Sequence, residues 1–375
     1  MIWLAIPALA AAAYYLLALI AALSQRRNRE ALSFTPPISI LKPTHGRDPH
    51  LYDALRSHAA QDYPAFEILF GVGDANDAAI EDIRRLQSEF PRIPISLHIV
   101  RTAAPNAKAG VLAELARHAR HPVLLVNDSD IKVPPNYLRD VTAALAEPET
   151  GLVTCLYRAA ADSWPSRAEA LGIATEFAPS VLVARLLGVA EFALGSTMAF
   201  RAETLQRIGG FEVISQYLAD DYQLGRHISQ LGYRIRFATP VVETNLGAEG
   251  WPQVWRHQVR WSRTIRVSRA SGYYGYVVTH ATLWALVALA ASAWWAAALA
   301  LGLRAMAGIW IGAVTLQDRK TLRYFWMMPL RDLFGFAVWI AGLFGDTVVW
   351  RGQTLRLRAD GRIVKAETAN LTRRH

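Results

Sequence analysis

Cysteine is almost absent from this sequence: Cys155 is the single one in 375 residues. An intramolecular disulfide is therefore excluded, and no grouping of Cys and His residues indicates a zinc site. Charged residues are also scarce at 19%, whereas hydrophobic residues make up 53% and the mean hydropathy is +0.16. This composition is typical of a membrane-attached protein with room for one large domain or two modest ones.

The first apolar region begins at the N-terminus. Residues 2–23 carry no charge and are long enough to span a bilayer as one helix. Arg26, Arg27 and Arg29 follow this stretch, whereas a secretory signal carries its positive charge first. We therefore expect a retained anchor, residues 1–24, with its N-terminus outside and the following chain in the cytosol. A cleaved signal is the alternative.

A second apolar region occupies residues 274–350. Residues 276–316 are long enough for a tight pair of spans. Residues 333–350 are apolar but have positive charge on both sides, which favours a re-entrant or interfacial helix over a simple span. The sequence leaves three and four spans open, and we expect residues 351–375 to form a basic tail.

The net charge of +9 does not indicate a nucleic-acid-binding protein, because of where the basic residues lie. They flank the apolar regions instead of spreading among aromatic residues across the middle of the chain. Basic residues in this position are typical of contacts with anionic lipid headgroups on the cytoplasmic side. We therefore expect a membrane as a partner and no nucleic acid. These residues are Arg26, Arg27, Arg29, Arg256, Arg260, Arg263, Arg266, Arg269, Arg351, Arg356, Arg358, Arg362, Lys365, Arg373 and Arg374.

Residues 36–155 alternate between short apolar runs and amphipathic segments. This alternation predicts strands and helices that build a parallel sheet. The expected strands are residues 38–43, 66–71, 95–100 and 122–126, and the expected helices are residues 53–60, 77–89 and 108–119. Because ligands of open α/β sheets bind at the carboxyl ends of strands, Asp74 and Asp128 should lie towards one crevice.

Asp128-Ser129-Asp130 follows the last of these strands directly. Two carboxylates with one residue between them form a compact oxygen site for Mg²⁺ or Mn²⁺, which in turn holds a diphosphate. A plain surface turn is the alternative, but the neighbouring motifs favour the metal site. Asp128 and Asp130 are therefore the expected metal ligands.

Two further positions are candidates for binding a nucleotide donor. Asp74 lies between glycines after a strand, where it is either a contact to the base or ribose or part of an ordinary turn. Lys108 lies at a helix start, a position that already favours anions, and either neutralises a diphosphate or is a solvated surface residue. Further on, Gly209 and Gly210 permit a loop lying close beneath a bound sugar, or form a structural turn.

Asp220 and Asp221 precede an amphipathic helix. Adjacent carboxylates there either complement the helix dipole or include a general base that takes the proton of an attacking hydroxyl. We choose Asp221 as the base, supported by Asp220. Arg260 is a candidate to hold a leaving diphosphate and Trp261 to form a stacking wall; an interfacial Arg/Trp anchor is the alternative.

Four of these motifs, taken in order, resemble the D, D-x-D, D, (Q/R)-x-x-R-W series of GT-A glycosyltransferases. They are Asp74, Asp128-Ser129-Asp130, Asp221 and His257-Gln-Val-Arg260-Trp261. More narrowly, the chain resembles the ceramide glucosyltransferase family and its bacterial hopanoid-biosynthesis branch along nearly its whole length. His257 stands where ceramide enzymes usually have Gln or Arg. The apolar residues 179–190 replace a His-containing segment, and we expect them to line an acceptor groove.

The resemblance implies an α/β fold, with a GT-A (nucleotide-sugar-binding, Rossmann-like, mostly parallel sheet) domain at residues 36–270 between N-terminal and C-terminal transmembrane helices. It implies a bacterial inner-membrane protein whose catalytic domain faces the cytosol and needs Mg²⁺ or Mn²⁺. Donor-binding residues would be Asp74, Lys108, Asp128 and His257.

The resemblance also implies the reaction, an inverting transfer of N-acetylglucosamine from its UDP-sugar to bacteriohopanetetrol. The alternative is UDP-glucose with ceramide. A processive polysaccharide synthase is disfavoured, because the C-terminal membrane region is too short for a channel. A non-catalytic sugar-binding membrane protein would require all of these motifs to be accidental.

Overall fold

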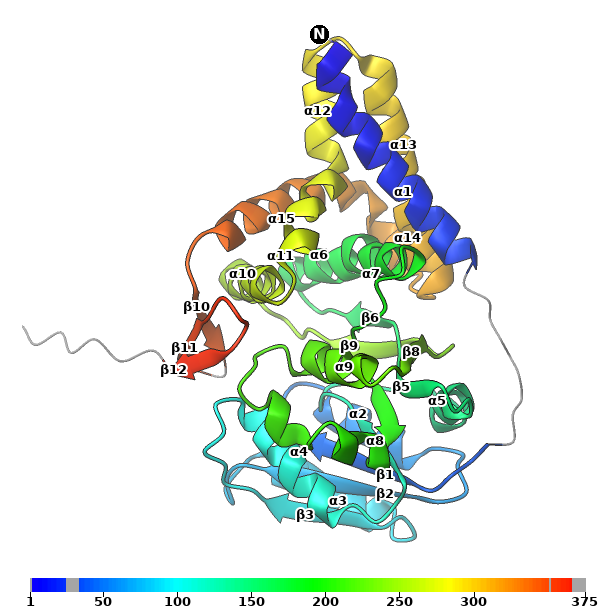
Figure 1. Ribbon diagram of the computed structural model, residues 1–375, viewed down its shortest axis with the longest axis vertical. Helices are drawn as coiled ribbons and strands as arrows, with labels where there is room; N and C mark the ends of the chain where they lie inside the picture. The colour runs from blue at the N-terminus through cyan, green and yellow to red at the C-terminus, as the bar shows by residue number, and fades with distance from the viewer. Residues whose placement is uncertain (1, 25–33, 351, 366–375) are drawn as a thin grey trace, which may run out of the picture.

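The computed structural model describes residues 2–24, 34–350 and 352–365. Its centre is a seven-stranded sheet in the order β3-β2-β1-β4-β7-β5-β8 (Figure 1). The pairs β3-β2, β2-β1, β1-β4 and β5-β8 are parallel, whereas β7 runs antiparallel to β4 and β5. The mostly parallel α/β sheet expected from the sequence is confirmed. The strands are β1 (Ile38–Pro43), β2 (Phe66–Val72), β3 (Ile95–Ile99), β4 (Val123–Val126), β5 (Thr150–Thr154), β7 (Met198–Arg201) and β8 (Arg234–Phe237).

Helices cover both faces of this sheet. Successive side chains of a strand point to opposite faces, so Ile40 of β1 joins one hydrophobic core and Leu41 joins the other. The first core is completed by α2 (Leu51–Ala59), α3 (Ala79–Glu89) and α5 (Tyr137–Leu145). The second is completed by α4 (Ala107–His118), α8 (Ala202–Arg207), the short helix η3 (Phe211–Ile214) and α9 (Asp220–Gln230).

A layer of helices lies between this sheet and three apolar helices, α1 (Ile6–Ser24), α12 (Ala281–Ala290) and α13 (Trp294–Ile309) (Figure 1). We call these three the membrane-type helices. Beneath the layer, β6 and β9 form a small parallel sheet. The helix α15 lies across the layer and packs against α10, and the interfacial position expected for the helix near residue 333 stays a prediction. The elements are β6 (Tyr157–Ala160), α6 (Trp164–Gly172), the π-helical turn η2 (Ile173–Phe177), α7 (Ala178–Leu186), β9 (Val242–Asn245), α10 (Trp251–Ser268), α11 (Ala270–Gly275), η4 (Tyr276–Thr279) and α15 (Met328–Leu343).

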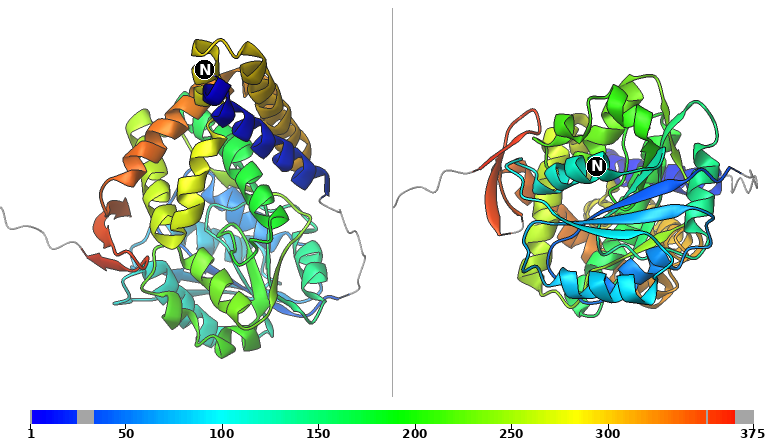
Figure 2. Two further views of the ribbon diagram at one scale, coloured as in Figure 1. Left: turned by 45° about the horizontal axis from the view of Figure 1, so that its top comes forward. Right: turned by 90° about the horizontal axis from the view of Figure 1, so that it is seen from below.

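Three apolar helices extend together from this layer, as both Figure 1 and Figure 2 show. They are α1 (Ile6–Ser24), α12 (Ala281–Ala290) and α13 (Trp294–Ile309), which pack through alanines such as Ala8, Ala288 and Ala296. Small residues let helix backbones approach closely, while large apolar side chains such as Trp3 and Trp294 remain exposed. This arrangement suits a lipid environment. The remaining short helices are η1 (Ile2–Ala5), η5 (Trp310–Thr315), α14 (Lys320–Tyr324) and η6 (Phe325–Met327).

Within the described parts of the chain, two helical stretches are long and apolar enough to cross a membrane: Trp3–Ser24 and Trp294–Thr315. The segment expected to form a pair of spans therefore contains one such stretch, because α12 is apolar but only 10 residues long. The basic residues Arg26, Arg27 and Arg29 lie outside the described residues.

The end of the chain differs from the expected basic tail. Residues 347–365 build an antiparallel sheet of β10 (Thr347–Trp350), β11 (Gln353–Leu357) and β12 (Ile363–Lys365). Val348, Leu355 and Ile363 pack with Leu218, and the Ile363 N–H donates to the Gln216 carbonyl at 2.8 Å. A boundary at residue 350 would cut through this sheet. Arg351, Arg373 and Arg374 lie outside the described residues.

Candidate active site

The Asp128-Ser129-Asp130 motif follows β4 after one residue, Asn127, at the carboxyl edge shared with β1. Lys42, near the end of β1, is buried beneath it and donates from Nζ to the Asp128 carbonyl at 2.9 Å. Burial lowers the pKa of Lys42 to about 7, against the opposing charges of Asp130 and Asp128. The sequence analysis did not identify Lys42 as part of the site. The pattern that could have indicated it is a single charged residue in a mainly apolar strand.

The two carboxylates of this motif have different environments. The Thr244 hydroxyl of β9 donates to Asp130 Oδ2, and the side chain of Asp128 remains 46% exposed. Burial, and next the charge of Asp128, raise the pKa of Asp130. The raised pKa of Asp130 thus follows first from its burial and only second from the charge of Asp128. A divalent cation held there would favour the charged form of both carboxylates.

Lys108 connects the metal motif to the pair of aspartates that begins α9. Its Nζ lies 2.8 Å from Asp128 Oδ1 and 3.0 Å from Asp220 Oδ2. Burial alone would lower the pKa of Lys108, but the Asp128 and Asp220 carboxylates raise it above its ordinary value. Asn106 caps the helix α4 by accepting from the Ala109 N–H, which fixes the first turn that carries Lys108. The alternative of a solvated surface lysine is therefore wrong.

Asp220 and Asp221 are adjacent but have different partners. Asp220 is buried and paired with Lys108, whereas Asp221 accepts the Gly195 N–H on Oδ2 at 2.9 Å and the Tyr222 N–H on Oδ1 at 2.7 Å. Burial and the neighbouring charge of Asp220 raise the pKa of Asp221 to about 6. Ala219, not either aspartate, occupies the N-cap position of α9.

Gly195 lies where these charged groups converge. A Cβ atom at this position would lie 3.2 Å from Asp128 Oδ2, 3.4 Å from Asp221 Oδ2 and 3.8 Å from Lys108 Nζ. By contrast, Gly209 and Gly210 have φ values of +92° and +81°, as a tight turn requires, and a Cβ atom on either would meet only Val213 or Glu212. The structural-turn alternative holds for that pair, and Gly195 is the glycine of the site.

The helix α10 brings His257 and Trp261 to the same region. His257 Nδ1 lies 2.5 Å from Glu169 Oε1 of α6, and the rings of His257 and Trp261 are 4.7 Å apart. Trp261 also packs against Phe177, with ring centroids 6.0 Å apart. Glu169 is a buried carboxylate, and no sequence motif pointed to it.

Arg260 of α10 lies near the carboxylates of Glu169 and Asp128. Burial lowers the pKa of Arg260, while the carboxylates of Glu169 and Asp128 oppose that shift. The guanidinium is partly buried near these carboxylates, and its contact with a leaving diphosphate stays a prediction.

Asp74 lies on the loop after β2, at the same edge of the sheet as Asp128. Its Oδ1 accepts the Asn76 N–H at 2.9 Å, as in an ordinary turn, and its carboxylate is exposed. A contact of Asp74 with a donor stays a prediction.

The described residues contain no group of three or more His, Cys, Asp or Glu side chains that could hold a metal ion. Asp128 and Asp130 nevertheless fit Mg²⁺ or Mn²⁺, because such ions commonly use one or two carboxylates and complete their shell with substrate phosphates and water. The carboxylate oxygens of Asp128 and Asp130 are hard donors, which agrees with this preference.

The apolar residues 179–190 do not form the expected groove. Val181, Leu182 and Val183 of α7 are buried in one cluster with Tyr15 of α1. The segment is mainly core that joins α7 to the membrane-type helices, and exposure of large apolar groups begins at Leu186 and Leu187.

Comparison with known proteins agrees with this geometry. The family model described as Glycosyl transferase family 21 matches residues 2–363. Ceramide glucosyltransferase 1 of Caenorhabditis elegans is 28% identical over 54% of this chain and 44% of its own length. The probable glycosyltransferase YdaM of Bacillus subtilis is 24% identical over 63% of this chain and 56% of its own. The chain thus spans about half the length of these curated relatives.

A solved structure with a similar fold is the mannosyltransferase PcManGT from Pyrobaculum calidifontis, in complex with GDP-Man and Mn²⁺. The TM-score is 0.55 at 20% identity, over 91% of this chain and 97% of that one. This similarity shows a GT-A-type fold.

Proposed function

The chain belongs to glycosyl transferase family 21, and from that premise we propose that it transfers a sugar from a UDP-sugar to the hydroxyl of a membrane lipid, with inversion. The observation that carries this proposal is the convergence of Asp128, Lys108 and Asp221 around Gly195, beneath the membrane-type helices. A carboxylate pair for a metal, a buried cation and a partly accessible carboxylate are the groups that direct displacement at an anomeric carbon needs.

Asp221 is the proposed general base. The acceptor oxygen attacks the anomeric carbon while the bond from that carbon to the diphosphate oxygen breaks, and UDP leaves with the electron pair. The hydroxyl proton passes to Asp221, whose pKa of about 6 leaves it ionised at neutral pH yet able to accept a proton. Asp220 supports this role while Lys108 balances its charge.

The donor side of the site is proposed as follows. A Mg²⁺ or Mn²⁺ ion held by Asp128 and Asp130 would supply positive charge to the diphosphate leaving group. Arg260 and His257 would contact the donor phosphates, Trp261 would form a wall for the acceptor, and Asp74 would contact the nucleoside.

The acceptor is proposed to come from the bilayer. The helices α1, α12 and α13 would anchor the protein, with the catalytic domain on the cytosolic side of a bacterial inner membrane. Where α10 packs against α15, the layer of helices carries an open, shallow apolar hollow lined by Trp251, Pro252, Trp255, Arg256 and Phe334. Tryptophan and arginine side chains are typical of the headgroup level, where a lipid hydroxyl is presented.

For the finer specificity we propose UDP-N-acetylglucosamine as donor and bacteriohopanetetrol as acceptor, from the hopanoid-branch resemblance. Ceramide with UDP-glucose is the second candidate, favoured by the names of the curated relatives. The burial of α7 removes the argument for hopanoid that rested on residues 179–190.

The test uses the full-length chain in vesicles with a panel of UDP-sugars and either bacteriohopanetetrol or ceramide. Glycolipid is identified by mass spectrometry and UDP release is followed in parallel, with Asp221→Asn as the inactive control. Glycosylated hopanoid is the expected product. Glycosylceramide alone would reverse the choice of acceptor, and release of UDP without any glycolipid would refute transfer to a lipid.

A further inference from the structure

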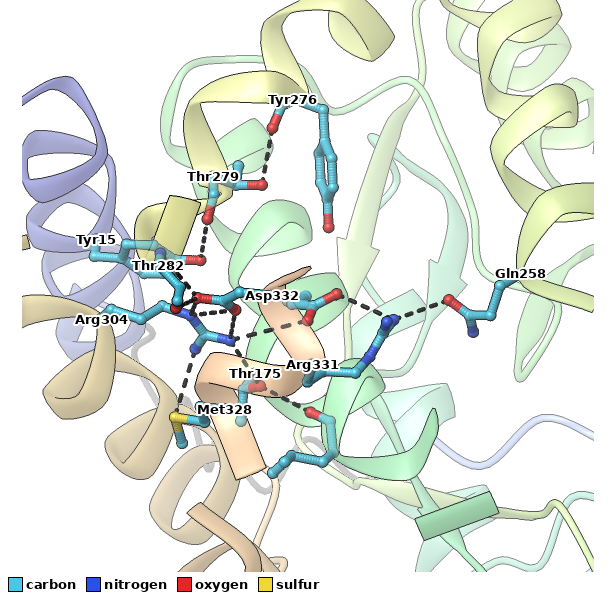
Figure 3. Close-up of polar contacts among 12 residues, drawn as sticks. Tyr15, Thr175, Gln258, Tyr276, Thr279, Thr282, Arg304, Met328, Arg331 and Asp332 are labelled. Carbon is cyan, nitrogen blue, oxygen red and sulfur yellow. Dashed lines mark hydrogen bonds and ion pairs between the residues drawn. The ribbon is translucent and has the colours of Figure 1, made fainter. Parts of the chain in front are cut away.

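A buried ion pair lies where the membrane-type helices meet the layer below them (Figure 3). Arg304 of α13 is 2% exposed, and its Nη2 and Nε lie 2.7 and 3.0 Å from Asp332 Oδ1 of α15. The Arg304 guanidinium also lies over the Tyr15 ring of α1, 5.0 Å from its centroid. The Thr282 hydroxyl of α12 donates to Asp332 Oδ2 at 2.8 Å. This pair therefore joins all three membrane-type helices to α15.

The same polar chain continues into the layer. Arg304 Nη2 donates to Thr175 Oγ1 of η2 at 3.2 Å. The next residue, Glu176, pairs with Arg331 of α15 at 3.1 Å. A π-helical turn such as η2 shifts the side-chain register of a helix, which here directs Thr175 and Glu176 towards two arginines.

Two glycines allow Arg331 to fit between helices. A Cβ atom on Gly172 of α6 would lie 2.3 Å from Arg331 Nε, and one on Gly335 would lie 3.1 Å from Glu176 Oε2. The Arg331 side chain therefore lies directly against the Gly172 backbone of α6, and a larger residue there would displace it.

Gln258 of α10 joins this chain to the candidate active site. Arg331 Nη2 donates to Gln258 Oε1 at 2.9 Å, and Gln258 Nε2 donates to Glu169 Oε1 at 2.9 Å. The Glu169 side chain is 2% exposed and holds His257. Burial raises the pKa of Glu169, but the bonds from His257 and Gln258 bring it below its ordinary value, so this carboxylate stays charged.

We propose that Gln258 is a positioning residue that fixes the active face of α10 relative to the membrane-type helices. The bilayer sets the height of a lipid hydroxyl, and α1, α12 and α13 are the elements that the bilayer would hold. A polar link from Arg304 to His257 therefore places Trp261, one turn further along α10, at a defined height against the acceptor. This inference rests on the proposed lipid acceptor. Glu176 Oε1 and Arg331 Nε and Nη1 are buried without a hydrogen bond in the described part of the chain, so this polar chain is costly to bury.

The test is a cycle of two exchanges in the full-length chain in vesicles. Gln258→Glu keeps the acceptor for Arg331 but sets a carboxylate against that of Glu169. Adding Glu169→Gln removes that repulsion, because an amide nitrogen in place of Glu169 Oε1 donates one hydrogen to position 258 and the other to Nδ1 of a neutral His257 ring. Gln253→Glu, an exposed exchange on the same helix, is the matched control.

We expect Gln258→Glu to lower kcat for lipid transfer by about 10-fold or more, with a smaller change in KM for the donor and in acceptor-free UDP release. The double variant should recover most of the loss, and Gln253→Glu should match wild type. Unchanged transfer in Gln258→Glu, or no recovery in the double variant, would overturn the inference. Wild type that glycosylates no lipid refutes the proposed function instead, and this inference with it.

Discussion

Gly195→Ala is expected to impair catalysis while leaving the fold intact. The added methyl group would stand 3.2 Å from Asp128 Oδ2 and 3.4 Å from Asp221 Oδ2. Contacts of 3.0–3.4 Å are tighter than nine in ten real Cβ contacts, so these neighbours must move by a few tenths of an ångström. The atoms that would move are oxygens of the proposed metal ligand and the proposed base.

The size of the effect follows from this geometry. A displacement of about 1 Å in a catalytic group costs roughly 100-fold in rate, so a few tenths should cost on the order of 10-fold in kcat. Gly195 has no positive φ, and alanine at an ordinary φ stabilises by about 0.4–1 kcal/mol through the unfolded chain. This gain offsets part of the crowding, so the melting temperature should change little.

Glycolipid formation and thermal unfolding are measured together for three variants. Gly302→Ala is the neutral control, because a Cβ atom there meets nothing within 4 Å. Gly225→Ala is the structural control, because its Cβ atom would lie 2.6 Å from the Ala193 backbone nitrogen and should destabilise the fold. Wild-type kcat in a folded Gly195→Ala protein would refute the placement of the reaction at Gly195.

Three further predictions concern the charged groups. Asp221→Asn should lower kcat by about 100-fold or more, with donor binding retained. In the wild type, kcat/KM should fall as the pH drops below about 6, because a protonated Asp221 cannot take a proton. The charged groups that face Asp221 are Asp220, Lys108 and Asp128. Chelation by EDTA should abolish transfer, and added Mg²⁺ or Mn²⁺ should restore it. The same ions should not restore transfer in Asp128→Asn. Full turnover in the presence of chelator would contradict the metal role. Lys108→Met should weaken donor binding and lower the melting temperature, since Asp220 is left buried without its cation; unchanged values in isothermal titration and thermal scans would argue against both roles.

The parallel half of the sheet was predictable from local pattern. Its strands are short apolar runs bounded by polar turns, and the observed elements differ from the predicted ones by a residue or two, as in α4, which spans Ala107–His118 instead of residues 108–119. The position of the Asp128 motif at a strand end followed from the same pattern, because the carboxyl ends of parallel strands share one edge.

The connections within the site were not predictable, since they join residues far apart in the sequence. Lys42 reaches the Asp128 carbonyl across 86 positions, and Thr244 reaches Asp130 across 114. Glu169 lies in a helix whose sequence carries no motif, and its importance appears only when α10 packs beside it. The C-terminal sheet was missed because its short strands lie among basic residues such as Arg356, Arg358 and Arg362, so the segment resembled a polar tail instead of a set of apolar strands.

The assignment of the base depends on a distinction that adjacent residues cannot show in sequence. Asp220 and Asp221 are both carboxylates in the first turn of α9, and both lie near Lys108. The fold directs Lys108 Nζ to Asp220 at 3.0 Å and leaves Asp221 with backbone N–H partners. A carboxylate held in a close ion pair is a poor proton acceptor, whereas one raised towards neutrality by burial is a better match for proton transfer near neutral pH. Exchange of Asp220 for Asn should therefore be the milder change for kcat, and a larger loss in Asp220→Asn than in Asp221→Asn would reverse the two roles.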